Sequence, residues 1–241
     1  MPDTWTTALA SYRYPVRLSE YVDRNLHPGW FVHDFLIGDH GQTSRFEERF
    51  RELGSSNTEA WIEVVYWKLY SQPMVRNGTT RKVFKGFNER QIGCSALNEA
   101  LSAYVATPTC ESFNDLRALF GFNTSAIAIV ATFPAFFDPD AHPMVDTRIA
   151  KWVEACMNQH NAADPNGPQL SKFPLRGTVL TMSAFDAFQD WRRWCIHTAK
   201  KLTTRTPMTW RARDVEMAVF HAWGGRRGPH PSVYLNPLGP I

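Results

Sequence analysis

Two stretches of the chain decide how it is expected to fold: LFGFNTS at residues 119–125 and DPDAHPMVDTRIAKWV at residues 138–153. In the first, Gly121 separates two segments whose apolar residues have helical spacing, 113–119 and 126–133. In the second, Asp146 precedes another such segment, after a loop with two Asp-Pro or His-Pro steps. The pair predicts two short helices joined by a tight turn, then a loop and a third helix.

The rest of the chain is predicted to be mainly helical as well. Residues 1–40 mix aromatic residues with Pro and Gly and are expected to form an irregular arm with short helical pieces, and no strand of any weight is predicted. Further helices are expected at residues 43–53, 59–70, 81–87, 96–105, 145–158, 184–202 and 210–223.

The expected fold class is all-α in the main, a two-lobed helical bundle containing a helix-hairpin-helix. We expect a single domain over residues 1–241, with helical lobes at about 58–160 and at 1–57 plus 178–241. The Pro-, Gly- and Asn-rich residues 161–177 are the candidate lobe junction, because such stretches favour exposed connections.

Composition excludes several classes of protein. The chain has 241 residues, 44% apolar and 20% charged, which suits a globular core and not a disordered chain. Its four cysteines form no C-x-x-C pair, which argues against zinc ribbons and cysteine-ligated clusters and favours a reduced cytoplasmic setting. No H-x-x-x-H pair, signal peptide or membrane span is visible, so neither zinc nor a membrane is expected.

Positive charge is concentrated in two stretches. Residues 68–91 carry six basic side chains against one acidic one, and residues 192–227 carry nine against two. Such stretches can form the footprint of a polyanion such as DNA. They are equally compatible with solvated helix faces, so charge alone decides nothing.

The turn at Gly121 has two interpretations. A tight turn exposes several backbone N–H groups beside the start of the next helix, which Thr124 or Ser125 can cap, and these groups can hold a phosphate. The alternative is an ordinary αα-hairpin closed by glycine.

The two stretches together resemble the helix-hairpin-helix DNA glycosylase superfamily. In that family L-x-G-h-G is followed about 20 residues later by V-D-T-H or a close variant, and Val145-Asp146-Thr147-Arg148 matches the second element. The similarity covers residues 113–158 well and 58–90 more loosely. The resemblance implies a DNA-repair hydrolase of base excision repair that flips a damaged, mismatched or modified base out of duplex DNA and cleaves its N-glycosidic bond.

The resemblance implies that Asp146 is the catalytic residue. A fixed carboxylate can stabilise the oxocarbenium-like sugar or orient the attacking water. The alternative is that Asp146 only caps the following helix. The family's lysine nucleophile corresponds to Ser125, which implies a monofunctional enzyme without AP lyase activity. Asn123 replaces the last hairpin glycine, and asparagine tolerates the left-handed backbone.

Further site residues follow from the same resemblance. The Ser71-Gln72 turn resembles the family element that fills the gap left by a flipped base, which makes Gln72 the first candidate wedge and Asn77 the second; an ordinary helix-terminating turn is the alternative. Tyr66 and Tyr70 could line a base pocket or belong to the core, and His142 could lie near the site or on a surface loop. The DNA-binding set comprises Gly121, Phe122, Asn123, Thr124, Ser125, Gln72, Arg148, Arg81 and Lys82.

The expected partner is double-stranded DNA, bound by a monomer in the cytoplasm, at the nucleoid if the source is prokaryotic. No iron–sulfur cluster is expected, and the resemblance allows a monovalent cation at the hairpin. Two other functions remain open: a non-catalytic helix-hairpin-helix DNA-binding protein, and a helical scaffold that binds no nucleic acid.

Overall fold

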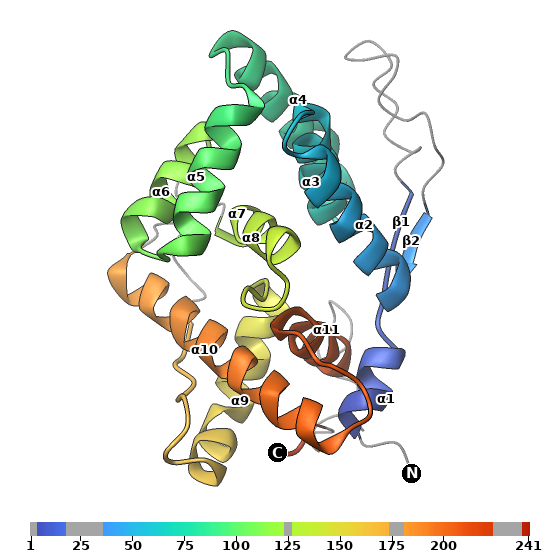
Figure 1. Cartoon of the computed structure of the whole chain (residues 1–241), viewed down its shortest axis with the longest axis vertical. Helices are drawn as coiled ribbons and strands as arrows, with labels where there is room; N and C mark the ends of the chain where they lie inside the picture. The colour runs from blue at the N-terminus through green and yellow to red at the C-terminus, as the bar shows by residue number, and fades with distance from the viewer. Residues whose placement is uncertain (1–3, 18–35, 123–126, 174–180, 224–237) are drawn as a thin grey trace. The chain divides into compact units, whose positions relative to one another are not determined.

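The computed structural model describes residues 4–17, 36–122, 127–173, 181–223 and 238–241. The chain forms two compact units, which we call the central unit, Tyr14–Phe137, and the terminal unit, Met1–Arg13 with Asp138–Ile241. Helices dominate both units, which confirms the prediction of a mainly all-α fold. Figure 1 shows the order of the elements along the chain.

The division between the units differs from the predicted lobes. It falls at residues 137 and 138, and the predicted junction at 161–177 lies within the terminal unit. The reason is the helix α9 (Thr147–Ala163), which packs its apolar face against α11 (Ala212–Trp223) and therefore belongs with the C-terminal helices. Residues 1–13 share the terminal unit with the C-terminal helices, whereas residues 14–57, which were expected to join them, belong to the central unit.

The central unit is built around α3 (Thr58–Leu69), whose side chains are buried at nine positions. A helix that is apolar on all sides needs neighbours all around it, and α3 packs against α2 (His40–Leu53), α4 (Pro73–Glu89), α7 (Ile127–Val130) and α8 (Thr132–Phe137). The remaining helices of this unit, α5 (Cys94–Ala106) and α6 (Cys110–Leu119), pack against each other.

The terminal unit surrounds α11, which packs against α1 (Thr4–Ala10), α9 and α10 (Met182–Arg205) (Figure 1). Its core is rich in indole rings: Trp152 packs against both Trp191 and Trp194, with ring centroids 6.2 and 5.5 Å away. Aromatic pairs at these spacings add about 0.5–1.5 kcal/mol each beyond the burial of their area.

Residues close to the helix ends account for several of the observed boundaries. Gly54 ends α2, and Asn57 caps α3 by accepting the N–H of Glu59 at 2.8 Å. α6 begins at Cys110, before the expected residue 113, with Thr109 as its N-cap and Ser112 completing a capping box from the third helical position.

Other boundaries differ from prediction. α4 begins at Pro73, well before the expected residue 81, because proline suits the first turn of a helix, where its missing N–H costs nothing. The expected helix at 126–133 is divided into α7 and α8, and α9 extends beyond Asn158 to Ala163.

A small sheet was not predicted. The strands β1 (Arg13–Arg17) and β2 (Leu36–Asp39) pair with each other. Strands this short, placed in a stretch rich in aromatic residues, Pro and Gly, give almost no periodic signal. Among the described residues, none of the helices is long and apolar enough to cross a bilayer.

Candidate DNA-processing site

Asp146 is the N-cap of α9. Its Oδ1 accepts hydrogen bonds from the backbone N–H groups of Arg148 at 2.8 Å and Ile149 at 3.0 Å, and its own backbone is extended. The capping role that the sequence left open is therefore present. Within the described part of the chain, Oδ2 accepts no hydrogen bond, so one carboxylate oxygen fixes the group and the other remains available.

The loop 138–146 that carries Asp146 is fastened to the two C-terminal helices. Four hydrogen bonds hold it: Arg213 N to Pro139 O at 3.0 Å, Ala212 N to Asp140 O at 3.3 Å, Arg192 Nε to Ala141 O at 2.9 Å, and Trp191 Nε1 to Met144 O at 2.9 Å. Each bond satisfies a loop carbonyl that no helix or sheet would satisfy. The loop is thus a fixed support for the carboxylate.

His142 lies in this loop and is fully buried, which contradicts its placement on a surface loop. Burial, together with the positive charge of Arg192, lowers its pKa to about 3. The imidazole is therefore neutral at ordinary pH and acts as a core side chain.

Arg148 lies close to Asp146 in the chain, but its guanidinium carbon is 4.2 Å from the ring centroid of Phe220 on α11. A guanidinium over an aromatic face is held by about 0.5–2 kcal/mol. To contact DNA as predicted, the guanidinium of Arg148 would either bind a phosphate while stacked on Phe220 or leave the ring.

The hairpin between α6 and α7 is described up to Phe122, and the predicted contacts Asn123, Thr124 and Ser125 lie outside the described residues. Gly121 has a φ of +64°, the left-handed conformation that favours glycine, and its N–H donates to Ala118 O at 3.0 Å. Phe122 stacks on Phe120 at 5.5 Å with an interplanar angle of 4°. The predicted glycine turn is therefore present.

We predict that Gly121→Val weakens binding to every DNA duplex alike. A Cβ at this position would lie 3.2 Å from Arg90 Nη2, and a β-branched residue at positive φ is strained by a further 1–2 kcal/mol or so. Because phosphate contacts carry no sequence information, the loss should not depend on the duplex. Filter-binding titrations of damaged and undamaged duplexes test this. Unchanged affinity in a folded variant would remove the hairpin as a DNA contact.

The Ser71-Gln72 turn connects α3 to α4 as expected. Gln72 is exposed, and its side chain makes no capping bond. Asn77 is exposed one turn further along α4. Between them lies Met74, whose side chain is 96% exposed, so an apolar group accompanies the two polar candidates at this surface.

The two tyrosines proposed for a base pocket occupy different environments. Tyr66 is completely buried, which places it in the core of the central unit. Tyr70 is partly exposed, and the guanidinium of Arg76 covers its ring at 4.6 Å. Neither ring is an open stacking platform in this structure.

The basic side chains of the two stretches differ in their exposure and in their partners. On α4, Arg81, Lys82 and Lys85 are exposed, and Lys85 pairs with Glu89 at 3.4 Å. In the second stretch most described cations face internal partners, namely Arg192 on Ala141, Arg193 on Asp190, Lys201 on Asp164, Arg211 on Asp214, and the buried Arg213 on Glu216. The formal charge of this second stretch therefore overstates what it can offer to a polyanion.

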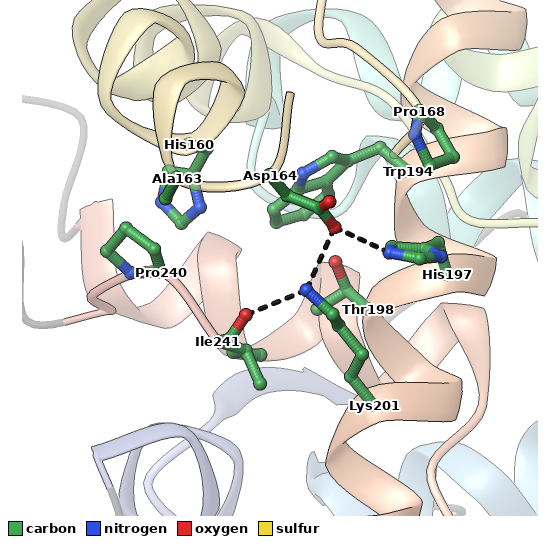
Figure 2. A pocket seen from close by; sticks show the side chains of 10 residues that line it. All are labelled: His160, Ala163, Asp164, Pro168, Trp194, His197, Thr198, Lys201, Pro240 and Ile241. Carbon is green, nitrogen blue, oxygen red and sulfur yellow. Dashed lines mark hydrogen bonds and ion pairs between the residues drawn. The ribbon is translucent and has the colours of Figure 1, made fainter. Parts of the chain in front are cut away.

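A polar pocket lies in the terminal unit at the C-terminal end of α9 (Figure 2). Asp164 Oδ2 is 2.8 Å from both His197 Nε2 and Lys201 Nζ, and Lys201 Nζ is also 2.8 Å from the main-chain oxygen of Ile241. Hydrogen bonds from Lys201 and then His197 lower the pKa of Asp164. The 17 residues of α9 put this pocket about 25 Å from Asp146. We assign it to fastening α9 and residues 238–241 onto α10.

Of the predicted site residues, the central unit contains the hairpin, Gln72 and the α4 cations, and the terminal unit contains Asp146 and Arg148. No group of three or more His, Cys, Asp or Glu side chains suited to a metal ion occurs among the residues with described positions.

No protein-family model matches the chain, and neither a curated protein nor a solved structure is significantly similar to it.

Proposed function

We propose that the chain is a monofunctional DNA glycosylase that removes a damaged, mismatched or modified base from duplex DNA. The observation that carries the proposal is Asp146, which caps α9 through Oδ1 alone at the end of a loop held by four hydrogen bonds. A carboxylate fixed in this way needs no reorganisation when positive charge develops nearby, and that preorganisation is the main source of electrostatic catalysis.

In the proposed reaction, the base leaves with the electron pair of the N-glycosidic bond, and the sugar acquires oxocarbenium character. Asp146 in its charged form stabilises this positive sugar and accepts a proton from the attacking water, whose oxygen forms the new bond to the anomeric carbon. A base inside the double helix is inaccessible to any protein pocket, so the nucleotide must first be flipped.

The turn at Gly121 supports the DNA-binding part of the proposal. A left-handed glycine after a helix, followed by a new helix, is a local arrangement that suits the binding of a phosphate by backbone N–H groups. Such contacts set the register of the protein on the duplex, and base selection has to come from elsewhere.

Base release from a panel of duplexes tests the proposal directly. The panel contains uracil, a T·G mismatch, 8-oxoguanine, alkylated purines and 5-hydroxymethyluracil, each assayed for alkali-labile abasic sites. Release from any member supports the proposal. Duplex binding with no release from a panel extended to further modified bases would contradict it.

Base release should not be accompanied by strand cleavage. Ser125 occupies the position of the family's lysine, and a serine cannot form a Schiff base with the sugar. We expect borohydride to trap no covalent protein–DNA adduct during turnover. A strong trapped band, lost on replacing Lys82 or Lys85, would show that another amine is the nucleophile.

A second candidate function is a non-catalytic helix-hairpin-helix DNA-binding protein. The two backbone hydrogen bonds to Asp146 Oδ1 favour it, because a capping role alone would explain them. In that case the protein binds duplex DNA with strong salt dependence and releases no base.

The exposed cations of α4 should contribute to the salt dependence of binding. Replacing Arg81 and Lys82 together with alanine should lower the slope of log affinity against log salt by up to about two, since each phosphate contact contributes about 0.9. Titration of a product-like abasic duplex across a salt series measures this. Identical slopes would exclude this face of α4 from the interface, and the proposal would then rest on the motifs of residues 113–158 alone.

A further inference from the structure

The guanidinium of Arg90 lies directly at the hairpin. Arg90 is the C-cap residue of α4, and its three side-chain nitrogens donate to three carbonyls: Nε to Gly86 O at 3.1 Å, Nη1 to Ala118 O at 3.0 Å, and Nη2 to Leu119 O at 2.6 Å. The last two carbonyls belong to the final turn of α6, immediately before Gly121. The side chain thus joins the end of α4 to the start of the hairpin.

Two glycines leave room for this guanidinium. A Cβ at Gly121 would lie 3.2 Å from Arg90 Nη2, and a Cβ at Gly86 would lie 3.3 Å from the same atom. Both distances are tighter than ordinary van der Waals contact. Gly121 therefore serves the turn through its positive φ and also through the space it leaves beside Arg90.

The arrangement is also favourable electrostatically. The last carbonyls of a helix have no partners within the helix and carry the negative end of its dipole. A guanidinium supplies positive charge and several donors in a fixed planar geometry, which a lysine cannot reproduce. Arg90 contributes one of the six basic charges of residues 68–91, but three of its five N–H donors are directed at protein carbonyls.

We infer that Arg90 is a positioning residue for DNA binding, which holds the hairpin in its phosphate-binding conformation without contacting phosphate. The inference rests on the proposed role of the hairpin in the function above. By bonding to α4 and α6 at once, Arg90 couples the cationic helix to the Gly121 turn, so the two elements engage DNA as one preorganised surface.

The test compares Arg90→Ala with a matched control, Arg51→Ala. Arg51 belongs to the same unit and also donates to a carbonyl near a helix C-terminus, with Nη1 3.0 Å from Phe136 O, but among the described residues it donates to no carbonyl of the Gly121 turn. We expect Arg90→Ala to weaken binding of an undamaged duplex roughly three- to tenfold, and Arg51→Ala to leave it unchanged. Arg90→Lys should restore only part of the affinity, because it keeps the charge and loses the planar donors.

The salt dependence separates positioning from direct phosphate contact. The slope of log affinity against log salt should be the same for Arg90→Ala and the wild type, whereas loss of a phosphate ligand lowers it by about 0.9. Combining Arg90→Ala with Gly121→Val should weaken binding no more than the stronger single change, because both act through one hairpin conformation. A lower slope, or fully additive losses, would overturn the inference.

A readout without DNA keeps the inference testable if the proposed function fails. The N–H of Gly121, bonded to Ala118 O at 3.0 Å, should exchange with solvent roughly tenfold faster in Arg90→Ala, while amides in α3 keep their wild-type rates. Unchanged exchange at Gly121 overturns the inference whatever the enzyme does. Faster exchange and weaker binding, with no base released by the wild type, would reject the glycosylase and leave the role of Arg90 intact. Should Arg90→Ala fold poorly, Arg90→Gln serves in its place.

Discussion

Replacing Asp146 with asparagine should reduce base excision by at least about 100-fold and leave duplex affinity unchanged or higher. The rate falls because a neutral amide cannot stabilise the positive sugar or accept a proton from water, and loss of one preorganised electrostatic group typically costs two or three orders of magnitude. Affinity is kept because the carboxylate repels DNA phosphates in the ground state. Single-turnover release from the best substrate of the panel, with a parallel binding titration, measures both.

The capping geometry makes asparagine the decisive substitution. Asp146 caps α9 through Oδ1, and asparagine caps a helix about as well as aspartate through its own side-chain oxygen. Asp146→Asn therefore removes the charge and keeps the cap, whereas Asp146→Ala also loses the cap, at about 0.5–2 kcal/mol of stability. If Asp146 were only a cap, the asparagine variant would excise bases at the wild-type rate, and the catalytic assignment would be wrong.

The parts of the fold that could be predicted are those with a local cause. Gly54 ends α2, Asn57 caps α3 and Asp146 caps α9, and each of these features depends on residues within one turn of the helix end. The Gly121 turn belongs to the same class, since its glycine supplies a backbone conformation that other residues avoid.

The features that sequence missed depend on residues far apart in the chain. Arg90 donates to Ala118, 28 residues away, and Arg192 donates to Ala141, 51 residues away. Nothing near Arg90 distinguishes it from the other basic residues of its stretch, so charge counting assigned it to the polyanion footprint. The two glycines beside its guanidinium are a signal only once α4 and α6 have been placed together.

The candidate site likewise contains features with a local cause and features that depend on residues far apart in the chain. Asp146 and the glycine turn were predicted from short motifs, and a core position for Tyr66 was one of two alternatives left open, but the burial of His142 was not predicted. Histidines and tyrosines occur both at the surface and inside proteins, so their type alone does not determine their environment. The aromatic residues that select a base, in the proposed function, cannot be named from spacing for the same reason.

Acid should destabilise the terminal unit through its buried histidines. The pKa of His142 is lowered to about 3 by burial and then by Arg192, and burial lowers that of His160 to about 4. In the unfolded chain both groups titrate near 6.5. Below that pH the unfolded state therefore binds protons that the folded state does not, and the free energy of unfolding falls as the pH is lowered from 6.5 towards 3 or 4.

The size of this effect is about 1.4 kcal/mol per pH unit for each histidine. Between pH 6.5 and 5 we expect about 2 kcal/mol from His142 and a similar contribution from His160. Urea unfolding at a series of pH values measures the loss. Burial raises the pKa of Glu63 in the central unit, so protonation of Glu63 stabilises the folded state as the pH falls and offsets part of the loss from the histidines. Variants must therefore be compared at the same pH.

His142→Gln isolates the contribution of the loop that carries Asp146. Glutamine does not titrate, so the fall in unfolding free energy between pH 6.5 and 5 should be about 2 kcal/mol smaller in this variant, even if its stability at pH 7 is lower. An unchanged pH dependence in His142→Gln would mean that His142 takes up its proton without unfolding the terminal unit. That result would contradict the lowered pKa of the buried imidazole, because a group that binds its proton equally in the folded and unfolded states adds no pH dependence to the free energy of unfolding.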